Sequence, residues 1–224
     1  MAIRIDKITK TSGILSFVAG YADTSTFVGA DRLFSAHITG NFVVFAYDIV
    51  TGQMFSSWIK LISFPVFIFS IGFSSLIIGK SDVYKRGAER LLIIECSLLL
   101  LAGGMAYFYR HLSMNSSLMV IITMLIVFAL GMQNAYGRFF VKEVFAPTTI
   151  MTGNVTQLII DITNYLKPIG QKRQDLSPRI VKGAYVIFPF LFGCITGGVI
   201  TNSIGLTSIV LPGILIFVAG KIRY

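Results

Sequence analysis

The sequence is poor in charged residues. Only 13% of its 224 residues are Asp, Glu, Lys or Arg, whereas 54% are hydrophobic. Because a typical soluble domain carries about 25% charged residues, this composition excludes a soluble globular domain and an intrinsically disordered chain. A mean hydropathy of +0.78 indicates instead a chain whose solvent is largely lipid.

Cysteine and histidine are also scarce, with two of each. Cys96 and Cys194 both lie in apolar runs and form no C-x-x-C pattern, so neither a disulfide framework nor a zinc cluster is expected. The sequence also lacks a Gly-rich phosphate loop and a nucleophile elbow. We therefore expect no metal, no cofactor and no enzymatic activity.

Acidic residues are the rarer charge: 10 against 19 Lys and Arg, a net charge of +9. A basic excess can serve nucleic-acid binding, but in so apolar a chain it fits loops that face an anionic membrane surface. We expect the lipid bilayer as a partner and no nucleic acid.

The abundant residues form eight apolar segments, which predict an all-α membrane protein with a single membrane domain over 1–224. The third, fourth, fifth and seventh segments reach the roughly 20 residues that a spanning helix needs. The second and sixth are short, with a polar start and a carboxylate near the end. The eighth contains Pro212-Gly213, which predicts a break or kink. The segments are 12–30, 37–51, 58–79, 90–109, 117–137, 148–166, 181–203 and 206–222.

The two short segments share a motif. Thr39-Gly40-Asn41 recurs as Thr152-Gly153-Asn154, and in both places an Asp-Ile pair follows after six residues. Upstream, Phe17-Val18-Ala19-Gly20 corresponds to Phe128-Ala129-Leu130-Gly131, which pairs Asp23 with Asn134. These ordered matches predict two internal repeats, at about 10–109 and 115–222. Since the first segment has a counterpart, we interpret it as a helix rather than a cleaved signal peptide.

Basic residues distinguish between two topologies, because cytoplasmic loops collect Lys and Arg. If the short segments do not cross, 16 of the 19 basic residues fall on one side and 3 on the other; if all eight segments cross, the division is 12 to 7. The sequence thus favours two inverted repeats, each with three spanning helices and one short broken or re-entrant segment. Both termini would be cytoplasmic. Eight spanning helices in two parallel repeats remain the alternative.

The paired motifs are the candidate substrate-binding site. Their glycines permit tight turns, and their Thr and Asn side chains are good helix N-caps. A half-helix N-terminus presents free N–H groups to an anion or a carbonyl, although both motifs could also be plain caps. The candidate residues are Asp23, Thr39, Gly40, Asn41, Asn134, Thr152, Gly153 and Asn154.

Three further ionisable residues are candidates for coupling. Asp48 and Asp161 each share a helix face with the preceding motif Asn; the alternative is that each lies at a solvated end. His37 precedes the first motif and could pair with Asp23, as could Arg32. Asp23 itself could couple protons or coordinate a cation.

Two other patterns concern packing. Glu95 follows Arg90 closely, which predicts an interfacial salt bridge. Gly103-Gly104, and Gly193 with Gly197-Gly198, resemble faces at which helices approach closely.

The combination of Phe17-Val18-Ala19-Gly20-Tyr21-x-Asp23, His37-x-Thr39-Gly40-Asn41 and the later Thr152-Gly153-Asn154 resembles the YoaK family of bacterial multi-pass membrane proteins. The resemblance covers nearly the whole chain. It implies a location in the bacterial plasma (inner) membrane and supplies no catalytic or binding residue.

Together these patterns lead us to expect a small-solute or ion transporter or channel, with its site at the repeat interface. The oligomeric state, including a homo-oligomer, stays open. The alternative is a membrane-embedded structural or regulatory partner protein without transport activity. A polar cavity reaching the middle of the membrane would favour transport, and a filled interior would favour the alternative.

Overall fold

A computed structural model describes residues 6–52, 54–79, 84–111, 116–142, 144–167 and 173–222. All regular structure in these ranges is helical, and each of the eight predicted segments contains a helix. The helices are α1 (Lys7–Gly29), α2 (Gly40–Val50), α3 (Met54–Gly79), α4 (Tyr84–Phe108), α5 (Ser117–Phe139), α6 (Met151–Leu166), α7 (Arg173–Ile204), the 3-10 helix η1 (Gly205–Ile209) and α8 (Val210–Ile222).

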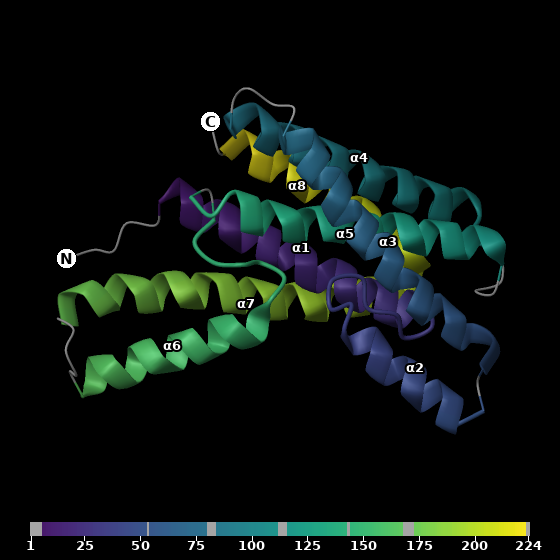
Figure 1. The fold of residues 1–224 in the computed structure, drawn as a ribbon, viewed down its shortest axis with the longest axis horizontal. Helices are drawn as coiled ribbons and strands as arrows, with labels where there is room; N and C mark the ends of the chain where they lie inside the picture. The colour runs from purple at the N-terminus through teal and green to yellow at the C-terminus, as the bar shows by residue number, and fades with distance from the viewer. Residues whose placement is uncertain are drawn as a thin grey trace.

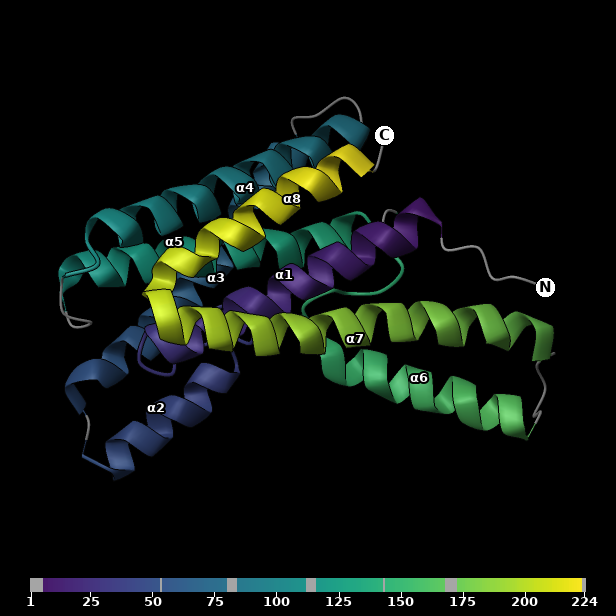
Figure 2. The ribbon, with the colours of Figure 1, turned by 180° about the vertical axis from the view of Figure 1, so that it is seen from behind.

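The long helices run roughly along the long axis of the molecule, and each packs on helices distant in sequence (Figures 1 and 2). The most extensive packing joins α1 of the first half of the chain to α7 of the second half. In addition, α5 of the second half packs against α3 of the first half. The helix α4 packs on both α5 and α8, and α8 also contacts α1. The two halves of the chain are therefore interleaved rather than set side by side.

The surface exposes many large apolar side chains, and the interior holds polar side chains within its apolar core, which is unlike a soluble protein. Val43, Val50 and Phe108 are each more than two-thirds exposed, whereas Asn41 and Gln133 are fully buried. Since lipid offers no hydrogen bonds, polar groups are stabilised inside and apolar groups outside. This distribution supports the prediction of an all-α membrane protein.

Four stretches are long and apolar enough to cross a membrane by length and composition: Ser57–Gly79, Arg86–Phe108, Ser117–Phe139 and Asp175–Lys221. They include the four segments that the sequence marks as long enough. The helix α2 has 11 residues. At 1.5 Å per residue it measures only ~17 Å, against a hydrocarbon core of about 30 Å. It is too short to cross the bilayer alone.

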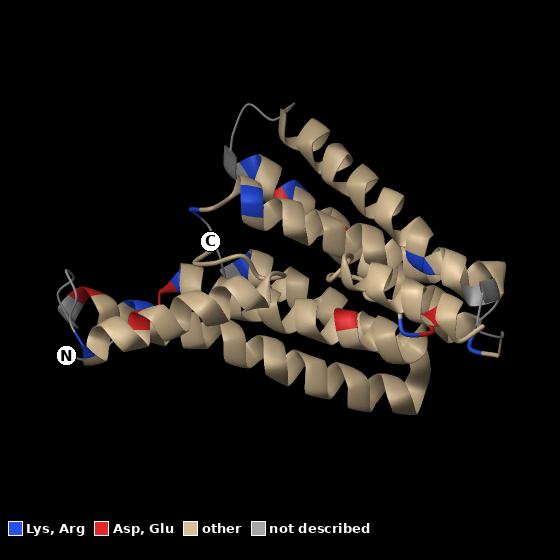
Figure 3. Cartoon of the chain, turned by 60° about the horizontal axis from the view of Figure 1, so that its bottom comes forward, with Lys and Arg blue, Asp and Glu red and all other residues tan. Residues whose placement is uncertain are grey.

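The two short helices begin near the middle of the molecule and point to opposite ends of its long axis, α2 to the lower right and α6 to the lower left in Figure 1. Each packs on the long helix that follows it, α2 on α3 and α6 on α7. The starts of α1, α4 and α7 and the end of α8 lie on the left, whereas the starts of α3 and α5 lie on the right. Figure 3 shows that most charged residues gather toward the ends of the helices.

The crossing of α1 and α7 depends on glycine. A Cβ placed at Gly20 would collide with the carbonyl oxygen of Phe190, and a Cβ at Gly193 with that of Phe17. A Cβ at Gly197 would likewise collide with the carbonyl oxygen of Tyr21. The predicted close-packing face on α7 is therefore confirmed at Gly193 and Gly197, where the two backbones touch.

The break before the last helix lies earlier than the sequence predicts. The chain turns at Gly205, whose φ of 67° favours glycine, and continues through η1. Pro212 is instead the third residue of α8, where its missing N–H costs no helical hydrogen bond. The prediction of a break at Pro212-Gly213 is thus wrong by several residues.

The N-terminal end of α1 is fixed to the other half of the chain. The Asp6 side chain accepts a hydrogen bond from the Thr9 N–H and so caps α1. It also accepts a hydrogen bond of 2.7 Å from Nζ of Lys182 on α7. The Lys182 ammonium group, together with Thr9, lowers the pKa of Asp6 to about 2. The pair ties the start of α1 to the first turns of α7.

We expect Gly193→Ala and Gly197→Ala each to lower the thermal unfolding midpoint in detergent micelles, because the added methyl group meets backbone atoms. Overpacking of this kind costs about 1–3 kcal/mol. Gly72→Ala on α3 is the matched control, because nothing lies within 4 Å of a Cβ there. Circular dichroism measures all three midpoints, and equal values would contradict the glycine-dependent crossing.

Candidate functional site

The short helix α2 turns its two polar residues inward. Its buried residues are Asn41 and Asp48, while Val43 and Val50 are exposed. Asn41 donates through Nδ2 to the Phe34 carbonyl oxygen and to Oγ of Ser63, both at 2.8 Å. Its Oδ1 accepts the Phe34 N–H at 2.8 Å. The amide thus satisfies the backbone of the loop that precedes α2.

Asp48 lies at the centre of a buried ion network. One carboxylate oxygen is 3.1 Å from an Arg32 guanidinium nitrogen, and the other is 2.8 Å from Nζ of Lys60 on α3. Lys60, itself 1% exposed, also donates to Asp31 at 2.6 Å. Asp31 and Arg32 adopt positive φ angles of 50° and 61°. Such backbone conformations persist where surrounding contacts over-determine them.

The alternative that Asp48 is simply solvated at a segment end is therefore wrong for this residue. Its carboxylate is fully buried, and its charge is compensated by two cations. Burying a carboxylate is tolerated when it is paired and hydrogen-bonded.

The second short helix makes a related set of contacts. Asn154 donates to the carbonyl oxygen of Pro147 at 2.7 Å, seven residues back, as Asn41 does to Phe34. Asp161 accepts a hydrogen bond of 2.8 Å from Gln157 and lies 3.1 Å from an Arg179 nitrogen on α7. Each short helix therefore carries an Asn that holds its preceding loop and an Asp paired with a cation on the next helix.

The two sets of contacts differ in accessibility. The Arg179 side chain is 42% exposed, against 1% for Lys60. A pocket of about 260 Å³ lies between α6 and α7. Polar side chains from both helices line it together with an apolar wall: Asn154, Gln157, Asp161, Arg179, Phe145, Leu158 and Val186.

The motif threonines do not cap the short helices. Thr39 is the residue before α2 but makes no side-chain cap hydrogen bond. Thr152 lies inside the first turn of α6, which begins at Met151. The capping interpretation is therefore wrong in its detail, because the Asn side chains bond backward to the loops rather than forward to helix N–H groups.

The motif glycines differ as well. A Cβ at Gly40 would lie 3.0 Å from the Phe34 ring, whereas a Cβ at Gly153 would meet nothing within 4 Å. Only the first motif therefore needs glycine for a close approach.

Asp23 lies less than two turns before the end of α1 and binds the loop before α2. Its Oδ1 accepts the backbone N–H groups of Ala36 and His37, at 2.7 and 3.3 Å. Its Oδ2 is 2.6 Å from Nδ1 of His37. Of the two predicted partners, His37 is the observed one, and the His37 ring also contacts the ring of Phe190 on α7.

On α5 the position that corresponds to Asp23 is Asn134, but the polar contacts there are made by its neighbour Gln133. Gln133, not Asn134, is the buried one, and it donates to the Leu15 carbonyl oxygen and to Oγ1 of Thr148, at 2.7 and 2.9 Å. Asn134 is half-buried beside it. Gln133 thereby joins α5, α1 and the loop before α6.

Glu95 does not form the predicted interfacial salt bridge. It is 1% exposed, and its Oε1 has no hydrogen-bond partner among the described residues. Its position on α4 is within the apolar core, whereas Arg90 is exposed.

The contacts of Asn41 and Asn154 stay within their own halves of the chain. The structure brings Asp23 to His37, and Asp48 to Lys60, but each short helix forms its own cluster. Within the described ranges, no group of three His, Cys, Asp or Glu residues is placed to hold a metal ion.

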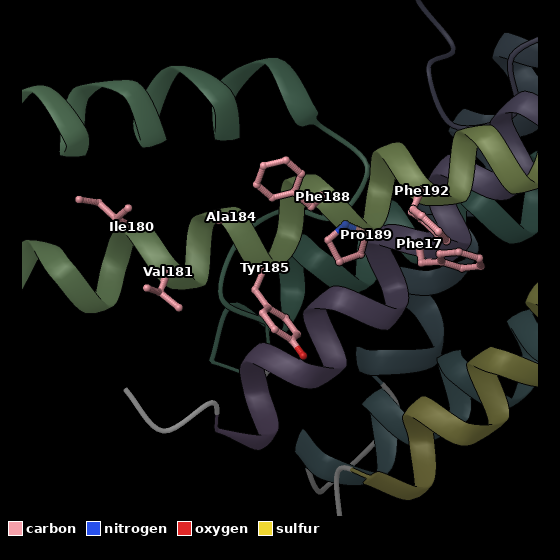
Figure 4. Close-up of a pocket in the computed structure, with 8 residues that line it drawn as sticks. All are labelled: Phe17, Ile180, Val181, Ala184, Tyr185, Phe188, Pro189 and Phe192. Atoms are coloured by element: carbon pink, nitrogen blue, oxygen red, sulfur yellow. The ribbon is translucent and has the colours of Figure 1, made fainter. Parts of the chain in front are cut away.

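Two other cavities have a different character. An apolar groove of about 600 Å³ runs along the outside of α1 and α7, from Phe17 to the aromatic residues around Pro189 (Figure 4). Its walls offer almost no polar atoms, as expected for a surface in contact with lipid. A polar cavity of about 690 Å³ lies at the ends of α4 and α7, beside Arg110 and Thr201, and not beside either short helix.

The most informative residues that sequence reasoning missed are Lys60 and Arg179. Each lies in a helix and pairs with the Asp of the preceding short helix. The signal was available, because each short segment is followed by a helix with a basic residue in its first turns.

The fold and the site define an all-helical membrane protein with buried polar clusters on two short helices. The chain belongs to the family described as "Protein of unknown function (DUF1275)", which matches residues 12–221. It is 21% identical over 178 residues to the UPF0700 transmembrane protein YoaK of Bacillus subtilis (strain 168), covering 78% of this chain and 76% of that protein. The expected resemblance to the YoaK family is confirmed. No solved structure matches the chain.

Truncating the two cations should have unequal effects. Lys60→Met removes the buried cation that Asp48 and Asp31 share, and we expect a loss of about 3 kcal/mol in unfolding free energy. Arg179→Met leaves Asp161 beside a pocket and still hydrogen-bonded to Gln157, so we expect a smaller loss, of about 1 kcal/mol. Denaturant unfolding of both variants in mixed micelles tests the difference; an equal or larger loss for Arg179→Met would contradict it.

Proposed function

We propose that the protein is a small-solute or ion transporter or channel of the bacterial plasma membrane, built from two inverted repeats. The observation that carries this proposal is the pair of short helices, each with an inward Asn and Asp, of which one set is sealed and the other borders a polar pocket. Secondary transporters use short or broken helices of this kind near the middle of the membrane.

The helix packing supports the repeat. In the repeat, α1 to α4 correspond in order to α5 to α8. The α1–α7 contact then has its counterpart in the α5–α3 contact, and the α2–α3 contact in the α6–α7 contact, and all four occur. The glycine contacts follow the same exchange: Gly20 approaches Phe190 and Cys194 on α7, and Gly131 approaches Phe67 and Ser70 on α3. The opposite directions of α2 and α6 in Figure 1 are those of an inverted pair.

The difference between the halves supports alternating access. Around α2 the Asp48–Lys60 pair is buried and Asn41 has three hydrogen bonds, so this half is the more closed of the two. Around α6 a polar pocket remains open beside Asp161 and Arg179. Two related halves in different states of closure are what a rocking mechanism requires, because each state is the other with the roles exchanged.

Asp23 and His37 are the candidate coupling residues. Their 2.6 Å contact joins a carboxylate and an imidazole, which together can hold or release one proton. The same carboxylate binds the loop before α2, so a change in its charge would alter the contacts that keep this half closed.

The orientation follows from the basic residues. Among the described residues, Arg32 follows the end of α1, Lys60 lies near the start of α3 and Arg110 follows the end of α4, which are the helix ends on the right of Figure 1. The other described basic residues lie near helix ends on the left. The positive-inside rule then places the ends of α1 and α8 that lie on the left in the cytoplasm. The alternative, a structural or regulatory partner protein, is favoured by one observation, the three internal hydrogen bonds of the fully buried Asn41.

Cysteine labelling tests the topology. In a variant with Cys96 and Cys194 replaced by alanine, Thr51→Cys and His111→Cys should react with a membrane-impermeant maleimide in intact cells. Arg86→Cys and Lys167→Cys should react only after the membrane is permeabilised. All four positions are exposed at helix ends. Reaction of Arg86→Cys in intact cells, without reaction of Lys167→Cys, would favour eight crossings.

Asp23→Asn tests the coupling. The amide oxygen can still accept the Ala36 N–H, so the fold should persist while the proton site is lost. A thermal-shift screen of small anions, cations and polar metabolites identifies a solute. In proteoliposomes, the variant should keep solute counterflow, whereas the rate of solute-driven proton movement should fall at least tenfold. Asp175→Asn, an exposed carboxylate on α7, is the control.

Proton movement equal to that of the unaltered protein would remove Asp23 from the mechanism. A loss of folding would instead identify the Asp23–His37 contact as a structural pair.

A further inference from the structure

The pocket between α6 and α7 holds one full charge of each sign. Asp161 and Arg179 line it, and their closest atoms are 3.1 Å apart. The two opposite charges make the pocket nearly neutral overall, although each charge keeps capacity for another partner.

That capacity can be counted atom by atom. The Asp161 contacts with Gln157 and Arg179 both use Oδ1, and Oδ2 has no partner among the described residues. Arg179 uses one terminal nitrogen for Asp161, while its guanidinium has five donors in all. The pocket therefore offers one carboxylate oxygen to a cationic group and several N–H donors to an anionic group.

The remaining walls limit the size and polarity of a ligand. Phe145, Leu158 and Val186 supply apolar surface, and Asn154 supplies an amide at the start of α6. The volume of about 260 Å³ is below the ~300–1,000 Å³ of sites that take drug-sized ligands. A ligand must be small, with a short apolar part beside its polar groups.

We propose that this pocket binds a small zwitterion, an α-amino acid with a short apolar side chain, whose carboxylate contacts Arg179 and whose ammonium group contacts Asp161. The inference rests on the proposed transport function only in naming the solute; the binding itself depends on the pocket alone.

Charge explains why a zwitterion is favoured over a simple anion or cation. An anion at Arg179 would also lie near the Asp161 carboxylate, and a cation at Asp161 would lie near the guanidinium. Each single charge would thus gain one attraction and meet one repulsion, whereas a zwitterion gains both attractions. The paired charges select against ligands that carry only one.

The other short helix shows why the site is confined to this half. The equivalent carboxylate, Asp48, is fully buried, and each of its oxygens lies beside a cation, one near Arg32 and the other near Lys60. Both oxygens of Asp48 therefore already face cations of the protein itself, whereas the Asp161 contacts with Gln157 and Arg179 use Oδ1 alone.

Three probes test the inference: L-alanine, propionate, which lacks the ammonium group, and ethylamine, which lacks the carboxylate. Isothermal titration calorimetry of the full chain in lipid nanodiscs measures their binding. We expect L-alanine to bind at least tenfold more tightly than either single-charge probe. Equal affinities for the three, or no detectable L-alanine binding, would overturn the inference.

Two variants test which residue contacts each charged group of the ligand. Asp161→Asn should lose at least tenfold in L-alanine affinity and gain propionate binding, because the guanidinium is then uncompensated. Arg179→Gln should lose as much and gain ethylamine binding. Asp175→Asn, outside the pocket on α7, should leave all three affinities unchanged. Circular dichroism confirms that each variant is folded, and L-alanine affinity unchanged in both pocket variants would contradict the assignment.

The failure of this inference can be told apart from the failure of transport. If L-alanine binds but is not carried into proteoliposomes, the binding site is supported and the transport function is contradicted. If another solute is transported and L-alanine does not bind, the transport function is supported and the zwitterion site is contradicted.

Discussion

Buried backbone groups need hydrogen-bond partners inside the protein, and this constraint governs the two loops that precede the short helices. A non-helical segment that is cut off from water must find its partners among the surrounding side chains. Before α2, the side chains of Asn41 and Asp23 supply them, binding Phe34 on one side and Ala36 and His37 on the other. The polar residues of the motif are therefore needed to build the irregular backbone, before any ligand is considered.

The same constraint explains the ion networks. The inward face of each short helix carries an Asp, and a buried carboxylate is stable only beside a cation. Lys60 and Arg179 supply that charge from the helices against which α2 and α6 pack. Charge pairing thus joins each short helix to its long neighbour, while glycine contacts join α1 to α7. Polar contacts set the local geometry, and close backbone packing sets the crossing of the long helices.

The helices were predictable because hydrophobic segments of lipid-facing helices are long and clear in the sequence. The inward orientation of Asn41 and Asp48 was predictable too, since residues seven apart share a helix face. Partners were harder to predict. The cation for Asp48 is supplied by a residue twelve positions later on another helix, and no periodicity relates the two. The fate of Glu95 depended on the packing of α4 against α5 and α8, which a local pattern with Arg90 could not reveal.

The difference between the two short helices has a cause in the sequence itself. Phe34 and Pro147 occupy equivalent places, seven residues before the motif Asn. Phe34 has an N–H that returns a hydrogen bond to Asn41, and its ring packs on Gly40. Proline has neither an N–H nor such a ring, so Asn154 receives no matching hydrogen bond and Gly153 stays open. One difference between the repeated motifs, Phe34 against Pro147, therefore accounts for the extra hydrogen bond of Asn41 and for the closer surroundings of Gly40.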